Sequence, residues 1–121
     1  MTARRCGALI VIALINSLPF GAAQGQSPTA GDLLAACKAF VDSTLEESNA
    51  FDGGICAGQI DALRNIGSSL GENKRYCVPR EVTTLQATRV VVQWMERSRE
   101  NLHHPFSVVA MTALRQSWPC K

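Results

Sequence analysis

The sequence is poor in the residues and motifs on which most catalytic and cofactor sites depend. It has two histidines, one tyrosine and 18% charged residues in a chain of 121. His103 and His104 are neighbours in the chain, and adjacent side chains on a helix do not face each other. The sequence contains no H-E-x-x-H motif, no nucleophile elbow and no glycine-rich loop after a strand. We therefore expect no enzymatic activity, no metal and no cofactor.

Basic residues are not in excess once the extreme N-terminus is set aside. The formal charge of the whole chain is +2, and Arg4 and Arg5 account for it. Over residues 24–121 the basic and acidic side chains are equal in number. Nucleic-acid binding relies on surplus cations that displace counterions from phosphates. We therefore expect no nucleic-acid partner.

No apolar run reaches the roughly 20 residues that a membrane span requires. The shorter run Gly7–Leu18 follows two arginines and precedes a Pro–Gly break and a pair of small residues, Ala22 and Ala23. This order is typical of a cleavable secretory signal peptide. Cleavage after Ala23 is the prediction, with cleavage after Gly25 as the alternative. The mature protein is predicted to be exported, with no stable membrane anchor.

Five cysteines are present, of which Cys6 lies in the predicted signal peptide. The four that remain, Cys37, Cys56, Cys77 and Cys120, favour two disulfides, because an even number is typical of small exported domains. No C-x-x-C pair supports a zinc site or a redox motif. Four cysteines allow three pairings. We favour Cys37–Cys56, which would join successive helices, and Cys77–Cys120, which would tie the C-terminus to the middle of the chain.

Four segments have helical periodicity, residues 32–47, 52–70, 84–99 and 105–118, and no segment alternates like a strand. The third begins with a capping-box signature at Thr83 and Gln86. The sequence predicts one all-α domain over residues 32–121, a compact four-helix arrangement with near-antiparallel neighbours and two disulfides. A cleaved signal peptide (1–23) and a flexible lead-in (24–31) precede it. The fourth helix is apolar around most of its circumference and should be largely buried.

The loop over residues 71–76 is one candidate surface for binding a protein partner; the alternative is an ordinary solvated connection between helices. It is predicted to expose charges of both signs beside a tyrosine, at a position fixed by a cysteine. Binding residues often lie on loops held by a rigid scaffold, and tyrosine is enriched at binding hot spots. The candidate contact residues are Glu72, Asn73, Lys74, Arg75 and Tyr76.

The predicted helix over residues 84–99 is the other candidate surface. It has two adjacent apolar stripes, and the core needs only the stripe of Leu85, Val92 and Met95. The second stripe, Ala87, Val90 and Trp94, would then face outward and form a homodimer or partner contact. The alternative is that Trp94 covers a disulfide.

Several short segments resemble those of a known family. They are C-A-G-Q-I at 56–60, C-V-P at 77–79, V-T-T-L-Q at 82–86, N-L-H-H-P at 101–105 and A-L-R-Q-S-W-P-C at 113–120. In this order, and with Cys37 in the first helix, they resemble the Rap1a/Tai family of small periplasmic proteins over about residues 33–120. Gln59 departs from the pattern, since the family often has an aromatic residue there.

The resemblance implies a non-enzymatic immunity protein, often dimeric. Such a protein binds and occludes a peptidoglycan amidase toxin that a type VI secretion system delivers. The alternative function is a general periplasmic binding or chaperone-like helical protein with no toxin partner. Chaperone activity of that kind favours conditional unfolding, which two disulfides oppose.

Overall fold

The computed structural model describes residues 25–121, so the predicted signal peptide lies outside the described residues. Four helices follow in order: α1 (Ala30–Val41), α2 (Ala50–Ile66), α3 (Thr84–Arg97) and α4 (Phe106–Ser117). Two short 3₁₀ turns, η1 (Gly67–Ser69) and η2 (Arg99–Asn101), follow α2 and α3. Within residues 25–121 the only β-type pairing is one isolated bridge between Thr29 and Pro105. The all-α prediction is confirmed.

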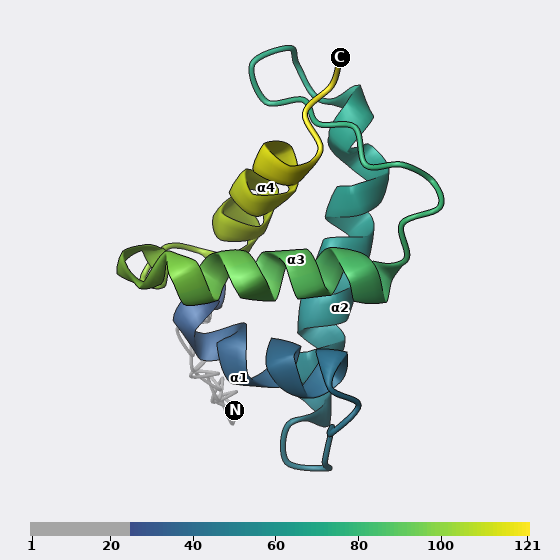
Figure 1. Cartoon of the computed structure of the whole chain (residues 1–121). Helices are drawn as coiled ribbons and strands as arrows, with labels where there is room; N and C mark the ends of the chain where they lie inside the picture. The colour runs from purple at the N-terminus through teal and green to yellow at the C-terminus, as the bar shows by residue number, and fades with distance from the viewer. Residues whose placement is uncertain (1–24) are drawn as a thin grey trace, which may run out of the picture.

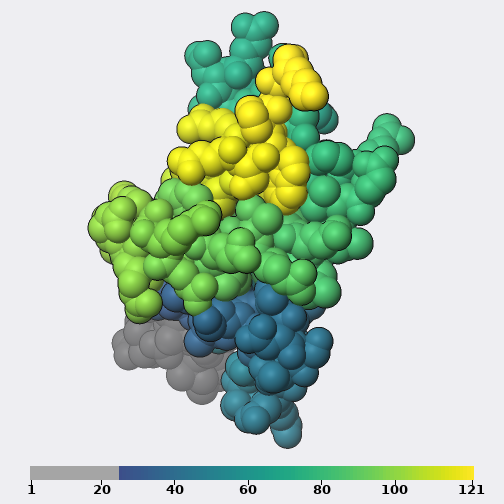
Figure 2. All heavy atoms as spheres, in the orientation of Figure 1, coloured from purple at the N-terminus to yellow at the C-terminus, as the bar shows by residue number. Residues whose placement is uncertain are grey.

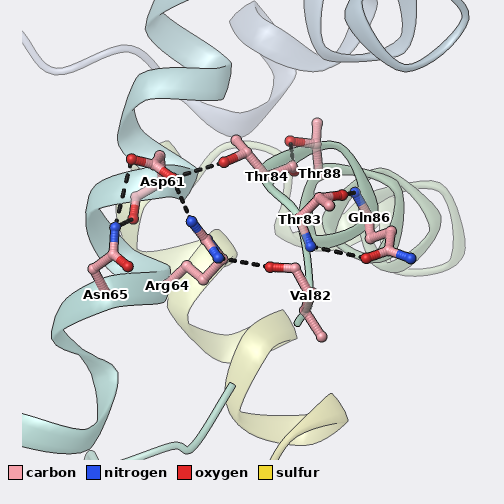
Figure 3. A network of polar contacts seen from close by, with 8 residues as sticks. All are labelled: Asp61, Arg64, Asn65, Val82, Thr83, Thr84, Gln86 and Thr88. Atoms are coloured by element: carbon pink, nitrogen blue, oxygen red, sulfur yellow. Dashed lines mark hydrogen bonds and ion pairs between the residues drawn. The ribbon is translucent and has the colours of Figure 1, made fainter. Parts of the chain in front are cut away.

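The helices do not form the near-antiparallel bundle that the sequence suggested. α3 runs across α2, with α1 and α4 on its two sides (Figure 1). Contacts between α2 and the start of α3 explain this geometry. The Thr84 hydroxyl donates to Asp61 Oδ1 at 2.7 Å, and the Arg64 guanidinium donates to the Val82 carbonyl at 2.6 Å. These bonds, shown in Figure 3, fix the start of α3 beside the body of α2.

The first residues of the domain are attached to the turn before α4. A capping box at Thr29 and Asp32 starts α1. The Ala30 amide donates to the His104 carbonyl at 2.9 Å, and the Phe106 amide donates to the Pro28 carbonyl at 2.9 Å. Residues 28–31 therefore belong to the folded domain, rather than to the flexible lead-in to which the sequence assigned them.

The ends of α1 and α2 also differ from their predicted positions. α1 stops at Val41 instead of residue 47, because Ser43 adopts a left-handed backbone conformation with φ of 57°. The chain then turns, and α2 starts at Ala50. Gly53 is buried there because the side chain of Leu45 packs on it: a Cβ at Gly53 would lie 2.5 Å from Leu45 Cδ2. The glycine therefore lets the connecting loop close onto α2.

All four helices contribute to one core, and two disulfides reinforce it. Cys37 and Cys56 are fully buried and join α1 to α2. Cys77 is paired with Cys120 and attaches the end of the chain to the α2–α3 connection, where the Cys77 amide also donates to the Trp118 carbonyl at 2.8 Å. These are the two pairs favoured from the sequence. The fully buried larger side chains are those of Leu33, Ile60, Tyr76, Thr88, Val91, Met95, Phe106 and Leu114.

Candidate functional site

Helix α4 has apolar side chains on two faces, and this domain covers only one of them. The inner face consists of five buried residues: Phe106, Val109, Ala110, Ala113 and Leu114. On the other face Val108 is 52% exposed, Met111 and Thr112 are partly exposed, and Arg115 is exposed. These four residues have the i, i+3, i+4, i+7 spacing of one helix face, and we call them the outer stripe. The prediction that α4 is largely buried is therefore wrong for this face.

The outer stripe lines a shallow groove. Its four residues and Lys74 enclose about 400 Å³. A smaller hollow of about 240 Å³ shares Val108 and Thr112 with this groove and extends to Trp94 and His104. Figure 2 shows the C-terminal part of α4, in yellow, at the surface between the teal loop at the top and α3 below. A continuous, partly apolar surface thus runs from the α2–α3 loop across α4 to α3.

The α2–α3 loop borders the groove and is attached to α4. Arg115 Nη1 donates to the Asn73 carbonyl at 3.0 Å, and the Lys74 amide donates to the Gly71 carbonyl at 2.8 Å. The four side chains of Glu72, Asn73, Lys74 and Arg75 are exposed. The structure therefore places these four predicted contact residues at the surface, next to the outer stripe.

Tyr76, the fifth residue predicted in that loop, is not at the surface. Its side chain is 0% exposed, and its hydroxyl donates to the Leu63 carbonyl at 2.8 Å. The ring lies against Gly67, where any Cβ would overlap it. Burial raises the pKa of the Tyr76 phenol above its ordinary value. Tyr76 therefore anchors the loop to α2. The prediction that Tyr76 contacts a partner is wrong, because its side chain is buried.

The stripe of Ala87, Val90 and Trp94, predicted to face outward on α3, is also largely buried. Ala87 is 0% exposed, and Val90 and Trp94 are partly buried, whereas Leu85, assigned to the core, is 37% exposed. The reason is that α3 packs against α1, α2 and α4, so a wide arc of its surface is buried. Trp94 Nε1 donates to Gln116 Oε1 at 2.8 Å, which places Trp94 at the junction with α4. Of the three residues, only Trp94 lines the continuous surface.

The charged side chains that line the groove are basic, whereas the adjoining loop also carries the exposed acid Glu72. Lys74 and Arg115 lie at its rim, and none of the side chains that line the groove or the adjoining hollow is acidic. Sequence reasoning missed the outer stripe, although part of its signal was present in the apolar residues around most of α4.

Other kinds of site are less supported in the part of the chain that the structure describes. Residues 25–121 contain no cluster of three or more His, Cys, Asp or Glu side chains that could hold a metal ion. None of the described helices has the length and apolarity that crossing a membrane would require. Cys37, Cys56, Cys77 and Cys120 are all in disulfides, so none of them is a free thiol.

These features define a small all-α domain, stabilised by two disulfides, with an exposed apolar face on its last helix. The chain belongs to the Rap1a immunity protein family, whose model, described as Rap1a immunity proteins, matches residues 29–120. No curated protein and no solved structure matches the chain. Membership in this family supports an immunity role and implies a protein partner.

Proposed function

We propose that this protein is a periplasmic immunity protein and that it binds its toxin through the outer stripe of α4 and the adjoining loop. The observation that carries the proposal is the uncovered apolar face of α4. A helix that is apolar on all sides is normally buried on all sides. Here Val108 is 52% exposed and Met111 is partly exposed, and both line a groove. Exposed apolar patches with polar rims are typical of protein interfaces.

The surface is held rigid on three sides, which favours tight binding. The Cys77–Cys120 disulfide fixes the end of the chain that follows α4. The hydrogen bond from Arg115 to the Asn73 carbonyl holds the loop, and the bond from Trp94 to Gln116 holds α3. A surface that is already ordered before binding loses little conformational entropy when a partner docks.

The charges of the rim favour a different protein over a second copy as the occupant. A second copy seated through its own outer stripe would present the same two cations, Lys74 and Arg115, and no acidic side chain lines the groove to pair with them. A partner segment with apolar and acidic residues complements this surface. A homodimer, which the resemblance implies, would therefore use another surface.

The family resemblance supplies the class of toxin. It implies a peptidoglycan amidase delivered by a type VI secretion system, whose active site the immunity protein occludes. Binding through α4 requires no chemistry from this chain, in keeping with a non-enzymatic role. A cleaved signal peptide would deliver the protein to the compartment in which such a toxin acts.

The test compares two apolar-to-acidic substitutions, one in the groove and one on a different helix. The oxidised protein is titrated against a peptidoglycan amidase effector encoded in the same genome, while amidase activity and heat of binding are measured. Val108→Asp places an acid in the groove, and Phe51→Asp is the control, because Phe51 is 79% exposed at the start of α2. We expect inhibition by the native protein, and a loss of affinity of at least about 30-fold for Val108→Asp, the effect of losing a hot spot.

Two outcomes would contradict the proposal. Unchanged affinity of Val108→Asp, together with unchanged thermal unfolding, would remove the outer stripe from the interface. A complete lack of binding and inhibition with the native oxidised protein would reject the amidase as partner.

A further inference from the structure

A separate, polar pocket lies where the end of α2 meets the connection to α3. It encloses about 490 Å³. Arg64, Asn65 and Ser68 line it from α2 and η1, and Val78, Pro79 and Arg80 line it from the connection. Two arginines, an asparagine and a serine therefore line one space, and no acidic residue is among the lining residues. None of these residues belongs to the α4 groove.

Arg64 is held in place before any ligand arrives. Its Nη1 donates to the Val82 carbonyl at 2.6 Å and its Nη2 donates to Asp61 Oδ1 at 2.8 Å (Figure 3). Asp61 also accepts from Thr84, and these hydrogen bonds hold the pKa of Asp61 below its ordinary value. Asp61 therefore stays ionised and keeps the guanidinium of Arg64 oriented at neutral pH.

Arg64 and Arg80 both have donors left for a ligand. A guanidinium has five N–H donors. Nη1 and Nη2 of Arg64 each use one N–H in the bonds to Val82 and Asp61, which leaves the second N–H of each, whereas Nε is buried and has no hydrogen-bond partner. Arg80 is exposed and forms no ion pair within residues 25–121, where the ion pairs are Lys38–Glu96 and Arg64–Asp61. Asp61 therefore pairs with Arg64, and within those residues no carboxylate pairs with Arg80.

The end of a helix carries partial negative charge, which would repel an anion unless its carbonyls are capped. Here two carbonyls near the end of α2 already have donors. The Leu63 carbonyl accepts from the Tyr76 hydroxyl at 2.8 Å and from the Gly67 amide. The Gly67 carbonyl accepts from the Tyr76 amide at 3.3 Å. This capping reduces the repulsion at the pocket.

We propose that the pocket binds a small oxyanion, a carboxylate or a phosphate, between Arg64 and Arg80. Arginine donors match the oxygens of both groups, and charge-assisted hydrogen bonds of this kind are among the stronger ones in proteins. Ser68 supplies a hydroxyl at the same pocket, and Pro79 restricts the backbone of the connection that bears Arg80. This site is independent of partner binding by α4.

The experiment follows the Arg64 Nε–H resonance by NMR, since a buried N–H without an acceptor should be a well-resolved reporter of the pocket. The ¹⁵N-labelled, oxidised protein is titrated with sodium phosphate in one series and sodium acetate in another. Sodium chloride at equal ionic strength is the control. We expect a saturable shift of Arg64 Nε–H and of the Ser68 amide with at least one oxyanion. Saturation by acetate identifies a carboxylate ligand, and saturation by phosphate alone identifies a phosphate ligand.

Two matched variants test whether the pocket is responsible. Arg80→Gln should weaken binding about tenfold or more, the effect of losing one charge-assisted hydrogen bond. Arg75→Gln removes the same charge from the same connection outside the pocket, and should leave binding unchanged. The oxyanion should also raise the thermal unfolding midpoint of the native protein and not that of Arg80→Gln.

The proposal is overturned if the shifts fail to saturate or if chloride produces them equally. It is also overturned if Arg75→Gln and Arg80→Gln weaken binding to the same extent, because net charge alone would then explain the effect.

Discussion

α4 and the loop beside it each have an anchored side and an open side, and the two sides differ in what their residues do. In α4, Val109 is 2% exposed and its neighbour Val108 is 52% exposed. In the loop, Tyr76 is 0% exposed while Arg75 is exposed. Residues adjacent in sequence thus have opposite environments. The anchored side gives the surface its shape, and the open side is free for contact with another molecule.

The difference is produced by a few long-range attachments. Tyr76 reaches Leu63 in α2, and Cys77 reaches Cys120 beyond α4. Each attachment uses one residue of the connection, while the charged residues Glu72, Lys74 and Arg75 stay exposed. Substitutions on the anchored side should therefore lower stability, whereas those on the open side should leave stability unchanged.

Removing the Cys77–Cys120 disulfide should have the largest effect on stability. The bridge closes a loop between residues 43 apart in sequence, which contributes about 4 kcal/mol in the chain-entropy model. Cys77→Ser/Cys120→Ser should lower the free energy of unfolding by about that amount, measured by urea denaturation without reductant. An unchanged urea midpoint would show that hydrogen bonds alone hold the end of α4 to the loop.

The adjacent valines of α4 provide the sharpest test of the two sides. Val109→Ala removes two buried methyl groups, worth about 0.8 kcal/mol each, and leaves a cavity. We therefore expect the free energy of unfolding to fall by about 2 kcal/mol. Val108→Ala removes the same atoms from the exposed face and should change stability by less than about 0.5 kcal/mol. Thermal or urea unfolding of both variants measures the difference. Equal losses would mean that Val108 is covered in the protein in solution.

Local signals predicted the helices, because periodicity and capping depend on nearby residues. Thr83 and Gln86 form the predicted capping box, and α3 starts at Thr84 as predicted. The crossing of α3 over α2 was not predictable in this way. It depends on Asp61 contacting Thr84 and on Arg64 contacting the Val82 carbonyl, contacts between residues that no local pattern connects.

The candidate site was predictable only in part, for the same reason. Glu72, Asn73, Lys74 and Arg75 are polar, and they are at the surface. Tyr76 follows them directly, but its position is decided by Gly67, which precedes the loop and has no Cβ to exclude the ring. Apolar periodicity located two stripes on α3, but it could not show that three helices would bury Ala87. Val108 and Met111 of the outer stripe resembled core in sequence, and the absence of a covering element over Val108 could not be read from that pattern.

Alanine substitutions at Gly67 of η1 and Gly58 of α2 test how closely the Tyr76 ring packs against the end of α2. Gly67 has ordinary helical backbone angles, φ of −52° and ψ of −42°, so an alanine there is opposed only by the Tyr76 ring. Gly67→Ala should cost about 1–3 kcal/mol through overpacking. Gly58→Ala is the control, because nothing lies within 4 Å of its Cβ position, and it should stabilise the protein by about 0.5–1 kcal/mol. If both variants are stabilised, the ring does not occupy the position described.

Tyr76→Phe should have the smallest effect, and it isolates the hydroxyl from the ring. The Leu63 carbonyl keeps its bond from the Gly67 amide, so losing the hydroxyl donor should cost about 1 kcal/mol at neutral pH. Burial raises the pKa of the phenol in the folded protein, which therefore holds this proton more tightly than the unfolded chain does. The contribution of the protonated phenol to the free energy of unfolding is complete below about pH 10, the ordinary tyrosine pKa. It is lost as the pH rises through the pKa of Tyr76 in the folded protein. Urea unfolding at pH 7 and at several values above pH 10 should show native stability falling more steeply than that of Tyr76→Phe. If stability falls equally with pH in the native protein and in Tyr76→Phe, the phenol is exposed to solvent and Tyr76 belongs to the open side of the loop.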